Sequence, residues 1–419
     1  MSRALLRNRN FVRFETGRFL SSLGSSLSSI AYPLLVLGLT HSPAKAGIVT
    51  AARTVPQPLL SLIAGAAADR GNRKRQMLLA DALRAVALGT LGMLVVTGAV
   101  QWWVIALVGL VEGIGTTTFT AASAGALRAV VPVPQLPDAI GVRRVWGSTV
   151  LIGGPPVGGA LFQVGRAVPF LADAVSYVLS TASLIRLRTP FQEQREPEKT
   201  PLRARLVEGV AYLWSRPFLR TCALLYGLGN PLISGILLVL VVVGRRQGLT
   251  GGEIGILTAA LGASSLFGSL LSPWARRSLS IRTIMLLEYT SWFGAWLFVA
   301  WPNVYALLAL VVPFGIAAPI TDSVVDGYRI AMTPDRLLGR VEAARTTIAQ
   351  LALPLGPLLA GVLLEHVSPR VAVTIFAACA LSLFIWGWLS QAIRSAPSLD
   401  ELVEITRSSA AAAPQPSAR

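Results

Sequence analysis

Three ionisable side chains lie within long apolar stretches of the chain: Arg53, Glu112 and Asp173. An unpaired ion inside a bilayer costs at least about 2.5 kcal/mol, so such residues are usually paired or functional. Counted along helices at about 1.5 Å per residue, all three fall near a common depth of roughly 20 Å. We therefore expect Arg53 to pair with one acid while the other binds and releases a proton.

Glu112 is the stronger candidate of the two acids, either for the coupling proton or for a positively charged substrate. The alternative is that Thr116 or Arg53 holds its carboxylate and that Glu112 serves folding alone. The same two interpretations apply to Asp173, for which packing is the simpler one.

A second pair of acids, Asp322 and Asp326, is spaced four residues apart, which places both on one face of a helix. Two interpretations remain open. The pair contacts a proton or substrate, or it belongs to a cytoplasmic salt-bridge gate; Arg329 or another cation could offset the repulsion between the two acids. Glu288, on the preceding apolar stretch, is expected to be structural.

These residues must be positioned by membrane helices. The chain is 53% hydrophobic and 14% charged, and its mean hydropathy of +0.62 leaves too few polar groups to cover a water-soluble globule. We expect twelve helices, because lipid allows no unpaired backbone and no alternating strand pattern occurs. The expected spans are 16–39, 46–68, 77–98, 102–127, 139–164, 168–187, 218–243, 253–275, 283–301, 303–328, 341–365 and 370–393.

Lysine and arginine gather in every second connection, which predicts that these connections and both termini are cytoplasmic. The net charge of +17 then belongs to one face of a membrane protein and does not indicate nucleic-acid binding. We expect a first bundle over 1–188, a cytoplasmic linker over 189–216, a second bundle over 217–395 and a disordered tail over 396–419.

The connection after the second span carries small residues, an acid and several cations: Gly65, Asp69, Arg70, Arg73 and Lys74. Gly65 allows close helix approach, and Asp69 could meet a helix N-terminus or an arginine of the other half. We expect this group to latch one conformation, with Asp81 and Arg84 pairing with the loop cations to hold it in shape. The alternative is that the cations only set topology.

The sequence also repeats itself. A shift of 202 residues superposes Arg143 on Arg345 and Gly154-Pro155 on Gly356-Pro357, so the fifth span corresponds to the eleventh. Two six-helix halves are implied, with a substrate path at their interface. The fifth span carries the pattern Gly-Pro-x-x-Gly-Gly at Gly154, Pro155, Gly158 and Gly159.

With these two motifs, residues 10 to 395 resemble the major facilitator superfamily. The first motif follows Gly-x-x-x-Asp-Arg-x-Gly-Arg-Arg/Lys, with Asn72 in place of the second glycine, and the second is associated with proton-driven exporters. The resemblance implies two pseudo-symmetric six-helix bundles and a central cavity formed by the first, fourth, seventh and tenth helices. The expected lining residues are Tyr32, Thr116, Phe119, Tyr226, Asn230 and Phe314.

Hydroxyls and aromatic rings with few fixed charges suit an amphiphilic small molecule such as a drug, antibiotic or siderophore. We expect a multidrug-type exporter of the bacterial inner membrane, working as a monomer by proton antiport, without a cofactor or metal. It is not expected to be an enzyme, since no nucleophile, base and metal constellation occurs. Uptake or lysolipid transport on the same fold, and a sensor without flux, are the alternatives.

Overall fold

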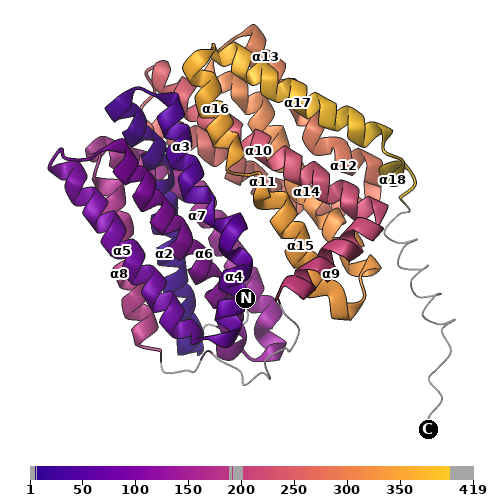
Figure 1. Ribbon diagram of the computed structural model, residues 1–419, viewed down its shortest axis with the longest axis horizontal. Helices are drawn as coiled ribbons and strands as arrows, with labels where there is room; N and C mark the ends of the chain where they lie inside the picture. The colour runs from indigo at the N-terminus through magenta and orange to yellow at the C-terminus, as the bar shows by residue number, and fades with distance from the viewer. Residues whose placement is uncertain (1–4, 6, 188–190, 192–201, 397–419) are drawn as a thin grey trace.

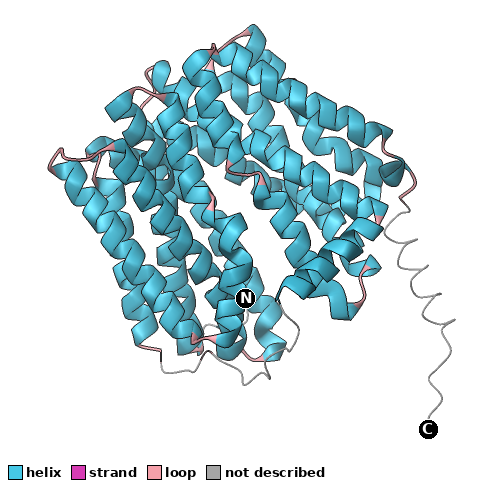
Figure 2. Ribbon diagram, viewed as in Figure 1, coloured by secondary structure: helices cyan, strands magenta, loops and turns pink. Residues whose placement is uncertain are grey.

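The computed structural model describes residues 5, 7–187, 191 and 202–396, and this part of the chain is almost entirely helical (Figures 1 and 2). Helices satisfy every backbone hydrogen bond within one segment, as a bilayer demands. The first half contains α2 (Arg9–Thr40), α3 (Pro43–Thr54), α4 (Pro56–Arg70), α5 (Arg73–Val96), α6 (Trp102–Val130), η1 (Val133–Gln135), α7 (Leu136–Val164) and α8 (Val168–Ile185).

The second half follows a helix, α9, in the later part of the predicted linker; residues 189, 190 and 192–201 of that linker, and the predicted tail from 397 on, lie outside the described residues. The elements are α9 (Leu202–Ser215), α10 (Pro217–Arg246), α11 (Gly251–Ser278), α12 (Ile281–Thr290), η2 (Ser291–Gly294), α13 (Ala295–Ala300), η3 (Val304–Leu307), α14 (Leu308–Met332), η4 (Asp335–Leu337), α15 (Leu338–Leu351), α16 (Leu355–His366), α17 (Pro369–Leu389) and α18 (Gln391–Arg394).

Within the described ranges, eleven helical runs are long and apolar enough to cross a membrane. The second predicted span is also helical but broken, because α3 ends at Thr54 and α4 begins at Pro56, whose ring removes a backbone donor. Counted with this broken helix, every predicted span has a helical counterpart. The predicted all-α membrane fold is confirmed.

The helices form two bundles, one on each side of Figure 1. In the first bundle α2 packs against α7 and α8, and in the second α10 packs against α16 and α17. The bundles join mainly where α7 lies on α11 and where α3 lies on α16, and α4 also contacts α15. The interface therefore uses the broken second span and the glycine-rich fifth span.

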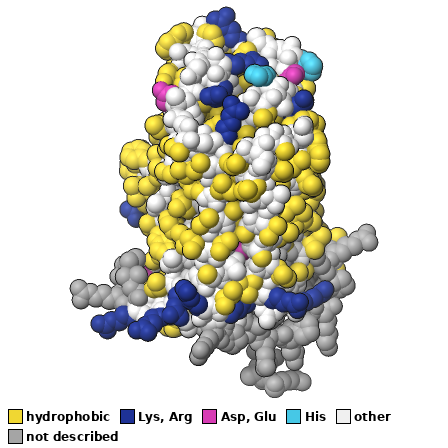
Figure 3. All heavy atoms as spheres, turned by 90° about the vertical axis from the view of Figure 1, so that its left-hand side faces the viewer, with side chains coloured by type: hydrophobic (Ala, Val, Ile, Leu, Met, Phe, Trp, Pro, Cys, Tyr) yellow, Lys and Arg dark blue, Asp and Glu magenta, His cyan; other side chains and the backbone are white. Residues whose placement is uncertain are grey.

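One end of the bundles, here called the basic end, carries the cationic connections 70–75 and 276–282; the other is called the far end. Figure 3 shows a belt of hydrophobic side chains across the middle of one face, with lysine and arginine at both of its edges. Such a belt matches the apolar core of a bilayer.

At the far end the two bundles touch backbone to backbone along a line we call the far seam. A Cβ atom added to Gly159 would lie 2.0 Å from the Gly251 carbonyl oxygen, and one added to Gly361 would lie 2.5 Å from the Pro43 carbonyl oxygen. Only glycine permits this approach. Glycines from both bundles form the seam: Gly47, Gly159, Gly251, Gly255 and Gly361.

At the basic end the bundles separate. The lower ends of α4 and α15 diverge in Figure 1, and a Cβ atom on Gly65 or Gly339, near those ends, would meet no atom within 4 Å. The bundles thus meet most closely at the far seam and draw apart toward the basic end.

Candidate functional site

The structure pairs Arg53 with Glu112 across α3 and α6. Arg53 Nε donates to Glu112 Oε2 at 2.7 Å, and Nη2 donates to Oε1 at 2.8 Å. The same Nη2 also donates to the Ser25 carbonyl oxygen at 2.9 Å, and the guanidinium lies 5.4 Å from the centre of the Tyr32 ring. Bidentate arginine pairs are among the strongest charged contacts. The expected pair exists, and Glu112 is the acid in it.

Asp81 and Arg84 form a second buried pair, so the expected pairing of these residues with the loop cations is wrong. They bond to each other, and Arg84 also donates to Ser21 and Thr116, each at 3.3 Å. The guanidinium lies 4.2 Å from the centre of the Tyr177 ring. Asp81 is buried and therefore needs a counter-ion nearby. Arg84, three residues along the same helix, is close enough to provide it.

Asp173 on α8 is fully buried, at 0% exposure. Ser28 of α2 donates to its Oδ2 at 2.6 Å, and Ser176 donates to its Oδ1 at 3.3 Å. A Cβ atom on Gly24 would lie 2.3 Å from Oδ1, so α2 closes over the carboxyl group. Among the described residues Asp173 has hydroxyl partners but no ion pair, whereas Glu112 has one.

Asp326 belongs to a salt-bridge cluster between α14 and α15. It lies 3.4 Å from Arg329 and 3.6 Å from Arg345, and both arginines also form ion pairs with Glu342, at 2.9 and 3.0 Å. This favours the gate interpretation for Asp326. Asp322 points elsewhere: it is exposed and lies beside the Tyr226 hydroxyl.

The first bundle has a related ion pair that the sequence reasoning missed. Glu15 of α2 is buried, accepts from Arg143 of α7 at 3.1 Å and pairs with Arg18 at 2.8 Å. The signal was present in the repeat, because the 202-residue shift superposes Arg143 on Arg345. Each half thus anchors this arginine to an acid near the basic end.

A cavity of about 300 Å³ lies between the bundles, below the far seam. Its lining is apolar apart from hydroxyl groups, and it carries no charged side chain. It is lined by Ser26, Ser29, Ile30, Pro33, Thr50, Thr54, Leu151, Pro155, Ser234, Leu237, Leu238, Val241, Thr258, Leu261, Leu353 and Pro357. Such a lining suits an amphiphilic molecule of modest size.

None of the six side chains expected to line a central cavity is among the residues that line this one. Tyr32 packs on Phe170, Thr116 and Phe119 contact Arg84, Tyr226 lies beside Asp322, Asn230 donates to the Ala349 carbonyl, and Phe314 packs against the core. The helices that supply this cavity include α3, α7, α11 and α16. The sequence predicted contributions from α2 and α10. It could not show that the interface helices also line the cavity.

The loop motif is present but latches nothing across the halves. Asp69 is 68% exposed, and its ion pair is with Arg73 of its own loop, at 3.2 Å. Arg73 also donates to the Ala68 and Phe191 carbonyls, and Lys74 donates to Leu187 at 2.6 Å, which ties the loop to the end of α8. Arg70 is exposed. This arrangement fits a structure that is open at the basic end.

The fifth-span motif contacts two neighbours at once. A Cβ atom would lie 2.0 Å from Ser26 Oγ at Gly154 and 2.2 Å from the Leu27 carbonyl oxygen at Gly158, both on α2. Gly159 faces α11 across the far seam, and Pro155 lines the cavity. The motif therefore packs α7 between α2 and α11.

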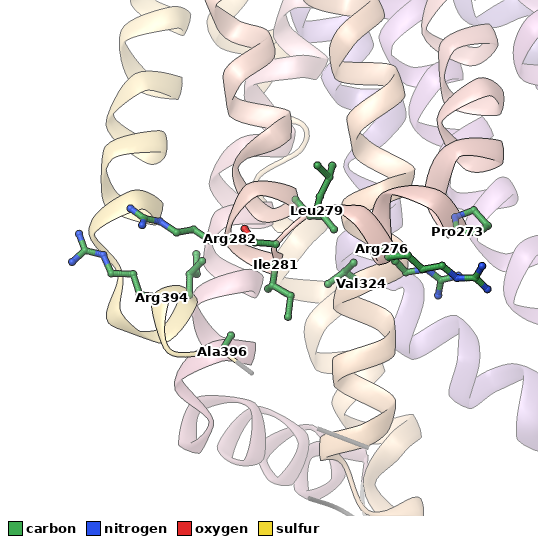
Figure 4. A pocket seen from close by; sticks show the side chains of 12 residues that line it. Pro273, Arg276, Leu279, Ile281, Arg282, Val324, Arg394 and Ala396 are labelled. Atoms are coloured by element: carbon green, nitrogen blue, oxygen red, sulfur yellow. The ribbon is translucent and has the colours of Figure 1, made fainter. Parts of the chain in front are cut away.

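A second hollow, of about 430 Å³, lies at the basic end near the ends of α11 and α18. Its lining includes Arg276, Arg277, Arg282 and Arg394, and Arg282 stacks on the Trp388 ring at 3.7 Å. In Figure 4 Arg282 and Arg394 extend to one side and Arg276 to the other. The arginines diverge and do not form one anion site.

Comparison with known proteins adds a family and a fold. A family model described as transmembrane secretion effector matches residues 2–414. The multidrug efflux pump Tap of Mycolicibacterium fortuitum is 28% identical over 82% of this chain and 86% of its own length. The enterobactin exporter EntS of Shigella dysenteriae serotype 1 is 24% identical over 78% of this chain and 79% of its own.

Solved structures agree on the fold. The nucleoside transporter NupG superposes with a TM-score of 0.75 at 14% identity, covering 90% of this chain and 100% of that one. A bacterial homologue of the iron transporter ferroportin, solved in an inward-facing state, gives a TM-score of 0.70 at 16% identity, covering 92% of this chain and 98% of that one.

Proposed function

Because the chain belongs to the transmembrane secretion effector family of the major facilitator superfamily, a family of multi-pass membrane transporters, we propose that it exports amphiphilic small molecules by alternating access in exchange for protons. Its relatives include a multidrug efflux pump and a siderophore exporter. Transport, not catalysis, is the activity proposed.

We place the protein in the bacterial inner membrane as a functional monomer. Its basic end and both termini face the cytoplasm, since lysine and arginine stay on that side. The two bundles, over 1–188 and 217–395, then rock about the cavity, and opening at the basic end is the state that loads substrate from inside.

The observation that carries this proposal is the uncharged, hydroxyl-bearing cavity between the bundles. An apolar wall binds the hydrophobic part of a substrate by burying its surface, and hydroxyl groups orient its polar part. Phosphorylated substrates, which need a cluster of arginine or lysine, do not fit this lining.

The test is proton movement in inverted membrane vesicles with an acidic lumen. Addition of an amphiphilic substrate should discharge the gradient in the wild type. Leu261→Trp, which fills the cavity, should abolish the discharge, whereas Leu270→Trp, on the same helix but exposed and outside the cavity lining, should keep it. Equal discharge by both variants, or acidification on adding substrate, would refute the proposal.

We assign the coupling proton to the first bundle. Glu112 is held by Arg53 and Asp81 by Arg84, so Asp173 is the buried acid of the first bundle that has no ion pair among the described residues. Asp322 is kept for substrate and Asp326 for the gate. The loop motif, with Asp69 at its centre, is proposed to latch the opposite, outward-facing state.

A further inference from the structure

Three oxygen-bearing side chains of the second bundle lie at one level: Tyr226 on α10, Glu288 on α12 and Asp322 on α14. They are nine, seven and ten residues from the ends of their helices at the basic end, which are Pro217, Ile281 and Met332. At about 1.5 Å per residue, each lies about 10 to 15 Å inside that end. Helices from three parts of the sequence thus bring oxygen atoms to the same depth.

The residues next to these three tie the helices together. The Tyr289 hydroxyl, beside Glu288, donates to the carbonyl oxygen of Leu225 at 2.8 Å and joins α12 to α10. The Thr321 hydroxyl, beside Asp322, donates to the Ile284 carbonyl at 3.0 Å and joins α14 to α12. The three side chains are therefore held in place by bridges on either side.

Glu288 is buried, at 8% exposure, and its Oε1 atom has no hydrogen-bond partner within the described part of the chain. Asp322 acts on Glu288 electrostatically, and the Tyr226 hydroxyl lies beside the Asp322 carboxylate. Asp322 itself is exposed, so its carboxylate is accessible to a ligand. A buried carboxylate without a partner is costly, and a bound cation removes that cost.

Neither carboxylate has an ion pair among the residues that the structure describes. The cation that acts on Asp322 is Arg345, and its guanidinium bonds Glu342 at 3.0 Å and lies 3.6 Å from Asp326. In the first bundle, by contrast, arginines pair with Glu112 and Asp81. The second bundle thus holds two acids without an ion pair at this level, whereas Glu112 and Asp81 of the first bundle are each paired with an arginine.

We propose that Tyr226, Glu288 and Asp322 form a binding site for one organic cation, the protonated amine or other monovalent head group of an amphiphilic substrate. Ser234, which lines the apolar cavity, lies two helical turns along α10 from Tyr226, about 12 Å away. The head group binds at the acids while the apolar part reaches toward the cavity. The site rests on the proposed function and names the charge of its substrate.

The test is binding of tetraphenylphosphonium, a permanent cation, to the purified full-length protein, with triphenylphosphine oxide as its neutral counterpart. Glu288→Gln and Asp322→Asn should each weaken cation binding by about tenfold to a hundredfold, the value of one charged contact. Binding of the neutral compound should be unchanged, which also reports that each variant is folded. Asp335→Asn removes an exposed carboxylate elsewhere and should leave both affinities as in the wild type.

Three outcomes overturn the site: no cation binding by the wild type, unchanged cation binding in both variants, or equal loss for the charged and neutral compounds. The result also separates the two proposals. Export of neutral compounds without cation binding would contradict the cation site but not the proposed export. Cation binding that depends on both acids, without any transport of substrate, would contradict the proposed export but not the cation site.

Discussion

At the scale of single residues, the first bundle is organised by charge pairing. Arg53 neutralises Glu112 and Arg84 neutralises Asp81, while Asp173 is left with serine hydroxyls. A carboxyl group sealed from water with only hydroxyl donors is accommodated most easily when it carries its proton. A helix movement that exposes Asp173, or brings an arginine to it, would release that proton.

Asp173→Asn keeps the shape and the hydrogen-bonding capacity of this side chain but cannot release a proton. We expect the variant to reach wild-type levels in the membrane and to bind substrate normally. Substrate-driven discharge of the proton gradient should fall by at least about tenfold, the effect of removing a group that acts in the rate-determining step. Retained discharge would move the coupling proton to another acid.

Arg53→Met leaves Glu112 buried beside an uncharged chain. Breaking one side of a buried pair costs about 3 to 5 kcal/mol, so we expect a lower melting temperature in detergent by fluorescence-detected size-exclusion chromatography. The double variant Arg53→Met with Glu112→Leu should recover most of the loss. If the double variant is no more stable than the single one, the pair is not the source of the effect.

At the scale of elements, α7 is a packing wedge between α2 and α11. Gly154 and Gly158 face α2, Gly159 faces α11, and Pro155 lines the cavity between them. Small residues give helices in lipid the close approach that replaces hydrophobic driving force. A change in the position of α7 therefore alters its packing against α2 in the first bundle and against α11 across the interface.

Gly158→Ala tests this packing. The added methyl would lie 2.2 Å from the Leu27 carbonyl oxygen, whereas at Gly153 on the same helix it would meet nothing within 4 Å. We expect Gly158→Ala to destabilise the protein by about 1 to 3 kcal/mol, as overpacking does, and Gly153→Ala to be neutral. Thermal unfolding of both variants in detergent compares them, and similar melting temperatures would contradict the packing role.

The helices could be read from the sequence because apolar length and the demand for paired backbone decide them. The pairing of Arg53 with an acid also followed, since three charges share one depth. The pairing of Asp81 with Arg84 could not be predicted. Their closeness to the loop suggested the loop cations as partners, but the two residues are buried and pair with each other. Glu15 was missed because a residue near a helix end looks solvent-exposed until α7 supplies Arg143.

At the scale of the whole molecule, two bundles meet at the far seam and separate at the basic end. The exposed Asp69, with its ion pair inside its own loop, is a consequence of that separation. The contacts of the seam must break, and the loop contacts must form, for the cavity to face the other side. The balance between these two sets of contacts decides which state is populated.

Gly361→Ala should shift this balance. Its methyl would lie 2.5 Å from the Pro43 carbonyl oxygen in the seam, while Gly339→Ala, at the open end, would meet nothing within 4 Å. With Cys222 and Cys379 replaced by alanine and Thr258→Cys placed in the cavity, we expect Gly361→Ala to raise labelling by a membrane-impermeant maleimide added from outside. Gly339→Ala should not, and equal labelling would show that the seam does not set the equilibrium.

The seam has one more consequence, which concerns electrical leakage. Carbonyl groups and glycine Cα atoms in direct contact leave no room for a file of water molecules, and water needs both space and polar partners to enter a protein interior. With that contact intact, the seam itself gives water no path between the cavity and the far end. Many copies of the transporter can then remain inactive in a membrane without letting ions leak through and dissipate the membrane potential.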